Sequence, residues 1–588
     1  MNLSAPAAAA GPALSVDAGN QTHAINPYIY GMNGYYLDST TAATAQPTVV
    51  RWGGDATSRY NYKLNTTNSA SDWYFENFTG EGNMLGGGTY TGFITATSGA
   101  GMQALMTVPV NGWVANSTVG ACSFTQSQFP NQESYDGTCG SGTYAEGSGG
   151  CTTAGGCSIF GNDTIAAITS ISVPAAAAPA AGSVTQTWAT GTWAGGWVNS
   201  ILSAYGAANS GKSVAIWDLD NEPAWWDAVH RDVHPVASTY DEVTNGGIGT
   251  ALAIKTVDPT AQVSGPVIDY WWNYFYSKKD IESGWGSGGP CYEPWSNPVD
   301  RTAHGGVPMI EYYLQQMAAA EATYGVRLLD YLDIHAYQAA TYNDSSVAFT
   351  TAGDTGEQLA RLNSTRAFWD PTYTDPNFPQ PNYTTDSNYT ASCSTPLQAP
   401  QTLRMMNAWV AKDYPGTKTA IDEYNFGGLE SINGAVTQAD VLGIFGREGL
   451  DMATLWPTQA YNTQQPGNYA FAMYRNYDGK QSQFGDESLN SSSADQSQLS
   501  VYGALRTKDN TVTVMVINKT FGDLTAALSI ANLPSTTTSA QSFLYSNANI
   551  SAIVAQPNVT VTPGSGGAAS TLSATFPAQS ITLLVIPD

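Results

Sequence analysis

Two glutamates stand in the surroundings that chemistry on a glycosidic bond requires. Glu222 lies at the end of the apolar run IWDLDNEP, and Glu423 lies in a second apolar run, TAIDEYNF. Each run is predicted to form a buried strand with its glutamate at the C-terminal end, where (β/α) barrels carry their catalytic residues. One carboxyl group of such a pair protonates the leaving oxygen, and the other attacks the anomeric carbon or activates a water. The pair therefore predicts glycoside hydrolysis.

The stereochemical outcome depends on the distance between the two carboxyl groups. Retention requires about 5 to 5.5 Å, whereas inversion requires about 6.5 to 9.5 Å to hold a water. The sequence leaves both outcomes open.

Polar residues near the same strand ends are candidates for supporting roles. Asn221 precedes Glu222 and is placed to reach a sugar 2-hydroxyl or to act as a plain capping amide. By strand alternation Arg51 and Asp220 both point into the barrel, so we expect them to form a pair that positions the glutamates, with direct contact to the sugar as the alternative. His335 and Tyr337 share the inward face of another strand. They are expected to hydrogen-bond near the nucleophile, although a lone barrel histidine is also an ordinary core group.

Short apolar runs alternate with helical periodicity through most of the chain, which predicts an α/β fold with a (β/α)8 barrel. Helices are expected at 188–208, 310–324, 401–412 and 439–448. The eight candidate strands are residues 29–33, 48–53, 103–110, 214–221, 262–268, 328–337, 418–424 and 453–457.

The pattern changes near residue 500 to an alternation of period two, as in TVTVMVI and SITLLVI. Such alternation, with Gly, Asn, Ser and Pro turns, predicts a β-sandwich. We therefore divide the chain into residues 1–26, whose strand at 14–16 joins the sandwich, a catalytic barrel over 27–474, and the C-terminal β-sandwich over 475–588. No spacer rich in Pro, Ser or Gly precedes the sandwich, so it should pack on the barrel through apolar surface.

The acidic composition of the chain limits the classes of molecule that it can bind. The net charge is −26 and the isoelectric point is about 4.3, so nucleic acid and anionic membranes would repel the chain. Acidic polysaccharides are disfavoured for the same reason, while a neutral polysaccharide is compatible. We expect a monomer that needs no cofactor. A structural calcium ion is compatible with the sequence.

The cysteines and the N-terminal segment indicate where the protein is located. Six cysteines, without metal-ligand spacing, predict disulfides in a secreted protein, with free buried thiols as the alternative. Four of them, Cys122, Cys139, Cys151 and Cys157, fall in a long Gly/Ser/Thr-rich segment at 111–181 and are expected to pair within it. Residues 1–12 lack the basic region of a secretory signal, and no apolar run has transmembrane length. We therefore expect an extracellular protein whose signal is absent from this sequence.

Seven motifs, in order, resemble glycoside hydrolase family 44, a family of endo-β-1,4-glucanases and xyloglucanases with a barrel and a β-sandwich. The motifs are VRWGGDATSRYNY, WDLDNEP, HRDVHP, LDIHAY, DEYNFGG, LWPT and FAMYRNYDG. The resemblance implies Glu222 as acid/base and Glu423 as nucleophile in a retaining mechanism. It also implies sugar stacking on Trp456, with Trp73 and Trp369 as further aromatic subsites. The chain departs from the family pattern at Asp55, where the family usually has Asn, and at Tyr62, where it usually has Trp. These departures affect one expected contact in the cleft but not the chemistry.

Two features fit an open cleft that holds a polymer. The segments after strands four to six are rich in tryptophan, whose rings pack against sugar faces: Trp225, Trp226, Trp271, Trp272, Trp285, Trp295 and Trp369. The HRDVHP segment is expected to brace the loop after strand four through salt bridges, with a metal or proton-relay cluster as the alternative.

Two other functions compete with a β-1,4-glucanase. A barrel endo-xylanase or β-mannanase would use glutamates at the same strand ends. A non-catalytic carbohydrate-binding protein would keep the aromatic residues, but it would have no need of both glutamates.

Overall fold

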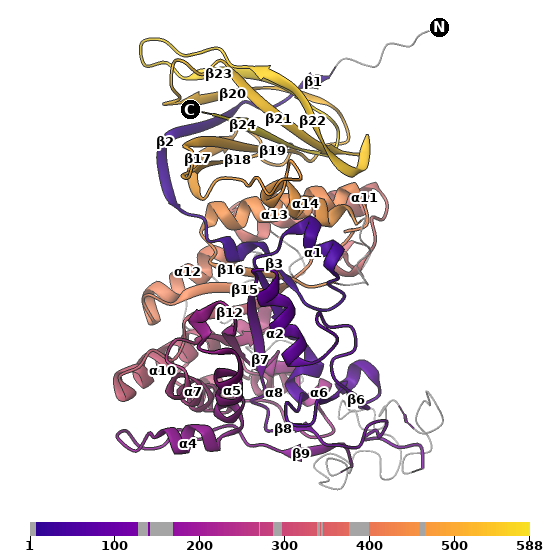
Figure 1. The fold of residues 1–588 in the computed structure, drawn as a ribbon, viewed down its shortest axis with the longest axis vertical. Helices are drawn as coiled ribbons and strands as arrows, with labels where there is room; N and C mark the ends of the chain where they lie inside the picture. The colour runs from indigo at the N-terminus through magenta and orange to yellow at the C-terminus, as the bar shows by residue number, and fades with distance from the viewer. Residues whose placement is uncertain are drawn as a thin grey trace.

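The computed structural model describes residues 8–127, 139–140, 168–269, 271–285, 297–337, 341–342, 345–374, 399–457 and 465–587. A closed parallel barrel carries a β-sheet domain stacked on one end (Figure 1). The predicted (β/α)8 barrel with a C-terminal β-sandwich is confirmed.

Eight parallel strands close the barrel in the order β10, β11, β12, β15, β16, β3, β4, β7. Each of the eight candidate runs overlaps one of them, and seven contain their strand completely; β16 begins one residue before the run at 453–457. Their bounds are Gly31–Asn33 (β3), Val49–Trp52 (β4), Gln103–Val108 (β7), Val214–Leu219 (β10), Gln262–Ile268 (β11), Tyr331–Ala336 (β12), Lys418–Tyr424 (β15) and Met452–Leu455 (β16). Apolar side chains from several strands, including Val49, Leu105, Ile216 and Met452, form a buried cluster. The barrel interior is therefore a packed core that fixes the strand ends.

The helices lie outside the barrel. Those expected at 310–324 and 401–412 are α10 (Met309–Tyr324) and α12 (Thr402–Asp413), and the one expected at 439–448 is the end of the longer α13 (Ile432–Glu448). The expected helix at 188–208 is interrupted, because the side chain of Thr192 accepts a hydrogen bond from the backbone N–H of Gly195 and begins a new helix. The result is α4 (Gln186–Gly191) followed by α5 (Trp193–Tyr205).

The second domain is one antiparallel-rich sheet that curves into a sandwich. Its long strand β2 (Leu14–Ala24) pairs with two strands of the C-terminal part, which places the predicted N-terminal strand in the sandwich. The other strands are β1 (Ala9–Ala10), β17 (Glu487–Ser493), β18 (Leu499–Arg506), β19 (Thr511–Asn518), β20 (Leu524–Ala531), β21 (Ser539–Ser546), β22 (Asn549–Thr560), β23 (Ser570–Phe576) and β24 (Ser580–Ile586).

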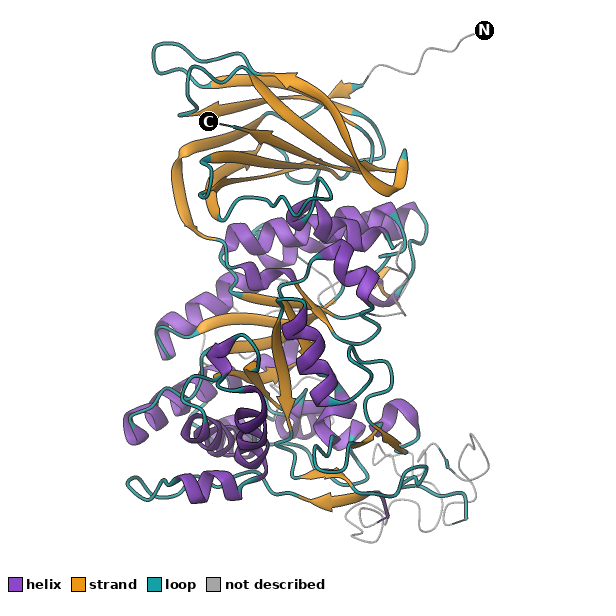
Figure 2. Cartoon of the chain, viewed as in Figure 1, coloured by secondary structure: helices purple, strands orange, loops and turns teal. Residues whose placement is uncertain are grey.

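The alternation along β19 has two apolar faces, and both are buried. Val512, Val514 and Val516 belong to the core of the sandwich, whereas Met515 and Ile517 belong to the cluster shared with the barrel. Helices α13 and α14 (Pro466–Arg475) lie between the sheet and the barrel strands (Figure 2). The two domains thus share a continuous apolar interface, as the missing spacer predicts.

A buried polar cluster, which the sequence reasoning did not find, also joins the domains. The Asp440 carboxylate on α13 accepts hydrogen bonds from Lys519 Nζ at 2.9 Å and from the Tyr502 hydroxyl at 2.7 Å. All three side chains are nearly inaccessible to solvent. The charges of the pair are therefore compensated inside the interface.

The long segment after β7 contains strands β8 (Trp113–Ala115) and β9 (Ser170–Ser172), which pair with each other. A disulfide joins Cys122 to Cys139, with 5.6 Å between the Cα atoms. The remaining cysteines, Cys151, Cys157, Cys291 and Cys393, lie outside the described residues. In the described part of the chain, every helix is too short or too polar to cross a membrane.

Candidate active site

The connection after β10 delivers Glu222 to the mouth of the barrel. Two of its residues have left-handed backbone angles, Asp220 with φ 70° and Glu222 with φ 42°. The backbone N–H of Glu222 donates to the carbonyl of Val267 on the neighbouring strand β11, at 3.0 Å. Pro223 then begins the short helix η7 (Pro223–Trp225). Sparsely populated backbone angles that are held by neighbouring strands are a common feature of catalytic positions.

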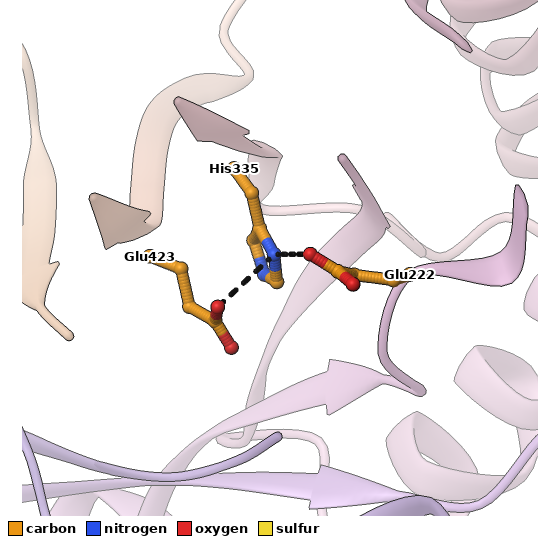
Figure 3. A group of neighbouring side chains, drawn as sticks. All are labelled: Glu222, His335 and Glu423. Atoms are coloured by element: carbon orange, nitrogen blue, oxygen red, sulfur yellow. Dashed lines mark hydrogen bonds and ion pairs between the residues drawn. The ribbon is translucent and has the colours of Figure 1, made fainter. Parts of the chain in front are cut away.

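Glu222 and Glu423 meet across the mouth, with His335 between them (Figure 3). One side-chain ligand atom of each of the three residues lies within 4.8 Å of the other two. This spacing of carboxylate oxygens fits the separation of about 5 to 5.5 Å in retaining enzymes and is shorter than the 6.5 Å or more, roughly, that inversion requires.

His335 is a buried cation that contacts three carboxylates. Its Nδ1 lies 2.7 Å from Glu222 Oε1 and 3.4 Å from Glu423 Oε2, and its Nε2 lies 3.0 Å from Asp422 Oδ1. Burial lowers the pKa of the imidazole, but the charges of Glu423 and Asp422 outweigh burial and hold that pKa well above its ordinary value. His335 therefore contributes a positive charge between the two glutamates.

Glu423 is held by two further donors. Arg51 Nη1 lies 2.5 Å from Oε1, and the Tyr337 hydroxyl donates to Oε2 at 2.9 Å. Burial raises the pKa of Glu423 above its ordinary value, and the charges of His335 and Arg51 reduce this rise. These three residues orient the carboxylate and favour its ionised form.

The expected pairing of Arg51 with Asp220 is wrong. Arg51 Nε instead lies 2.5 Å from Asp422 Oδ2 and 3.2 Å from Asp218 Oδ2. The carboxylate of Asp220 accepts the backbone N–H groups of Val110 and Asn111 at the end of β7. The alternation from which this pairing was expected stops at Leu219, because the positive φ of Asp220 turns its side chain away from the inward row.

Beneath the glutamates, one oxygen from each of three fully buried aspartates, Asp218, Asp333 and Asp422, lies within 4.8 Å of the others. Burial, followed by the charge of Asp422, raises the pKa of Asp218 well above its usual range, which favours the protonated form of Asp218. Burial would also raise the pKa of Asp422, but the charges of Arg51 and His335 hold it below the usual range. Consecutive residues Asp422 and Glu423 both reach Arg51, because the register of β15 shifts against both of its neighbours at this point.

Neither the cluster of three aspartates nor the cluster of Glu222, His335 and Glu423 resembles a calcium site. Calcium takes six to eight oxygen ligands, whereas cationic side chains already face both groups, Arg51 at the aspartates and His335 at the glutamates. The structural calcium stays a prediction.

Asn221 links the catalytic centre to the cleft. Its side-chain oxygen accepts from Arg51 Nη2 at 2.8 Å, and its Nδ2 donates to Asp55 Oδ1 at 2.8 Å. Burial, followed by the charges of Asp72 and Glu222, raises the pKa of Asp55 well above its usual range. This shift favours the neutral acid, whose oxygen accepts from Asn221 as the amide oxygen of an Asn would at this position. Tyr62, the other departure from the family, stacks on Trp197 outside the barrel, with 5.3 Å between ring centroids.

A cavity of about 440 Å³ opens at the barrel mouth, where residues that follow β3, β4 and β16 line it. Trp73 and Trp456 line it together with the carboxylic acids Asp55, Asp72 and Glu81. Aromatic walls with a few polar groups are typical of sugar sites. Gly54 also lines the cavity, and it must be glycine because its φ is +106° and a Cβ there would lie 2.7 Å from the Trp456 ring.

The structure does not bring Trp369 to this cleft. It follows α11 (Thr355–Ser364) and η11 (Thr365–Phe368), and the Arg447 guanidinium lies 4.3 Å from its ring centroid. Arg447 is at the C-terminal end of α13, just before β16 begins, so it lies at the opposite end of the barrel from Glu423. Trp369 therefore belongs to the interface with the sandwich.

The HRDVHP segment braces the loop after β10. Asp232 accepts from Arg59 Nη1 at 3.0 Å with both side chains buried, and His234 Nε2 lies 2.7 Å from Glu242 Oε1. These contacts agree with the expected salt-bridge network.

Comparison with known proteins points to one family. The family model described as glycoside hydrolase family 44 matches residues 66–340. The solved structure of CelM2, described as a bifunctional glucanase-xylanase from a metagenome library, is 35% identical, with a TM-score of 0.80 over 98% of this chain and 99% of that chain.

Two curated relatives are similar over part of their length. Endoglucanase A of Paenibacillus lautus is 34% identical over 55% of this chain, and beta-mannanase/endoglucanase A of Caldicellulosiruptor saccharolyticus is 27% identical over 87% of it. The chain spans 42% and 34% of the lengths of these two relatives.

Proposed function

Because the chain belongs to glycoside hydrolase family 44, we propose that it is a retaining, endo-acting hydrolase of β-1,4-glucan chains, with Glu423 as nucleophile and Glu222 as acid/base. The observation that carries the proposal is the approach of the two glutamates to within 4.8 Å of each other at the ends of different strands.

In the first step, the Glu423 carboxylate attacks C1 of the sugar in the cavity, and Glu222 gives its proton to the oxygen of the departing chain. The bond from C1 to that oxygen breaks as the ester with Glu423 forms. Since His335 holds Oε1 of Glu222, the other oxygen, Oε2, exchanges the proton with the substrate.

In the second step, Glu222 takes a proton from a water, and the water oxygen attacks C1 and releases Glu423. Two displacements at C1 preserve the anomeric configuration. Asn221, oriented by Arg51 and Asp55, is placed to hydrogen-bond the 2-hydroxyl, a bond that strengthens in the transition state.

The substrate is a neutral polysaccharide such as cellulose-type glucan, xyloglucan or mixed-linkage glucan. The net charge of −26 disfavours acidic polymers. Xylan is the second candidate, because CelM2 is described as a glucanase-xylanase, and mannan is the third, from the name of the Caldicellulosiruptor relative.

A substrate panel with product analysis tests the proposal. We expect hydrolysis of carboxymethylcellulose or xyloglucan with an early fall in viscosity, and NMR of fresh product should show the β-anomer. An initial α-anomer would exclude retention, while activity on xylan or mannan alone would replace the substrate assignment.

The two carboxyl groups carry out the whole reaction, so we propose that it requires no cofactor. We also propose that the protein is extracellular, which the Cys122–Cys139 disulfide supports. It acts as a monomer, since one chain supplies both glutamates and the groups that hold them.

A further inference from the structure

Two residues on the far side of the barrel mouth have no part in the mechanism above. The cavity residues Tyr35, Asp55 and Trp456 follow β3, β4 and β16. In the closed order of strands, β10 lies across from β16 and β11 lies across from β3. Trp225 follows β10 and Asp269 follows β11. Both therefore lie on the side of the mouth opposite the cavity.

Trp225 keeps an exposed ring beside the acid/base. Its side chain is 37% exposed, whereas that of the next residue, Trp226, is 1% exposed. The backbone N–H of Trp225 donates to the carbonyl of Glu222 at 2.8 Å, so one tight turn carries both residues. A large apolar ring that stays exposed at the barrel mouth is typical of a ligand-binding surface.

The orientation of this ring is fixed by the protein. The indole Nε1–H donates to the carboxyl group of Asp269, which is only 4% exposed and also accepts from Asn273 Nδ2 at 3.1 Å. Lys278 Nζ lies 4.9 Å from the ring centroid and covers one face. The exposed part of the ring therefore faces away from Lys278, and its position does not depend on a ligand.

Asp269 lies within electrostatic range of the acid/base. Burial, followed by the charge of Glu222, raises the pKa of Asp269 to about 8. The ring that Asp269 holds is therefore close to the carboxyl group that protonates the leaving oxygen.

We propose that Trp225, positioned by Asp269, is the stacking platform for the sugar on the leaving-group side of the scissile bond. The inference rests on the proposed function. With the attacked sugar in the cavity and Glu222 on the leaving oxygen, the departing chain crosses the rim formed by the ends of β10 and β11. The ligand class is a neutral β-linked pyranose, whose apolar face packs on an indole ring.

Reactivation of a trapped enzyme tests this platform. With 2-deoxy-2-fluoro-β-cellotriosyl fluoride, Glu423 displaces fluoride and forms a stable ester, which mass spectrometry detects. Cellobiose then restores activity when its 4-hydroxyl attacks C1 and Glu222 takes the proton. The variants are Trp225→Ala, Trp225→Phe, Asp269→Ala and, as matched control, Trp193→Ala, because Trp193 is a partly exposed tryptophan of α5 with Lys63 Nζ also 4.9 Å from its ring.

For each variant, the rate of reactivation in water alone is the baseline. Above this baseline, we expect Trp225→Ala to need a roughly tenfold higher cellobiose concentration than the wild type for half-maximal reactivation. Trp225→Phe should recover part of the response, Asp269→Ala should lie between Trp225→Ala and the wild type, and Trp193→Ala should match the wild type. An unchanged cellobiose response in Trp225→Ala would overturn the platform while the proposed function stands. A wild-type enzyme that hydrolyses no glucan and forms no ester would overturn both.

Discussion

Nδ1 of His335 lies 2.7 Å from Oε1 of Glu222. The imidazole is fully buried and also faces Glu423 and Asp422, so it sits among three carboxyl groups. A positive charge at this point reduces the repulsion between two glutamates that must approach each other closely. The centre therefore depends on the balance between the carboxylates and two buried cations, His335 and Arg51.

The two glutamates should respond differently to replacement. Glu222→Ala should slow substrates with poor leaving groups most, and an activated aryl glycoside should form the ester and then stall for want of a base. Azide should restore turnover and give the β-glycosyl azide. Glu423→Ala should lose about 10⁴-fold or more on every substrate, as removal of catalytic nucleophiles does elsewhere. Azide would then give the α-product, and the reverse pattern in kinetics and NMR would exchange the two roles.

Asp422 should set the pH range in which His335 is charged. Asp422→Asn removes a negative charge 3.0 Å from Nε2, so the pKa of His335 should fall and the alkaline limb of kcat/KM should move to lower pH. We expect kcat to fall about 10- to 100-fold, because Arg51 and His335 lose a charged partner.

Asp218→Asn is the matched control. Burial and the charge of Asp422 favour the protonated form of Asp218, and the amide keeps the charge of that form, so this variant should leave the alkaline limb in place. Equal pH profiles for Asp422→Asn and the wild type would contradict the positioning role of Asp422.

The ion pair between Lys519 and Asp440 should hold the two domains together. Lys519→Met leaves the carboxylate of Asp440 buried without its cation, and breaking such a pair costs about 3 to 5 kcal/mol. Thermal unfolding should begin at lower temperature, and limited proteolysis should cut between the domains sooner than in the wild type. Lys508→Met, at an exposed turn of the same domain, is the control. Identical digestion of the two variants would show that the apolar interface alone suffices.

Those parts of the fold and site that follow a strong local pattern could be predicted from the sequence. Apolar runs that end in Glu222 and Glu423 identify strand ends, and strand ends of a barrel meet at one face. The inward positions of His335 and Tyr337 follow from the same alternation, and both contact a glutamate.

The errors arise where backbone geometry departs from that pattern. Alternation does not predict a positive φ at Asp220 or the register shift that lets Asp422 accompany Glu423. A tryptophan in a long connection gives no sign of which end of the barrel it reaches, and the expected position of Trp369 in the cleft is therefore wrong. Asp218 and Asp422 could have been found, because a buried arginine needs anionic partners and both lie in the strands that carry the glutamates.

Glu81 in the cavity wall should make stability fall as the pH rises. Burial raises its pKa from the ordinary value of 4.5 to about 7, and the Tyr35 hydroxyl donates to it at 2.5 Å. Between these two pH values the folded state keeps a proton that the unfolded state has lost. The contribution of Glu81 is therefore complete below pH 4.5 and disappears as the pH rises through about 7. One such group changes the free energy of unfolding by about 1.4 kcal/mol per pH unit.

Glu81→Gln removes this titration while keeping the size of the side chain. In buffers of constant ionic strength, the thermal midpoint of the wild type should therefore fall steadily relative to that of the variant as the pH rises from 5 to 7.5. The matched control is Glu487→Gln, because Glu487 lies on β17 in the other domain, away from the cavity. A difference between Glu81→Gln and the wild type that stays constant over this range would mean that Glu81 is ionised in the folded protein, and the neutral carboxyl group in the cavity wall would have to be abandoned.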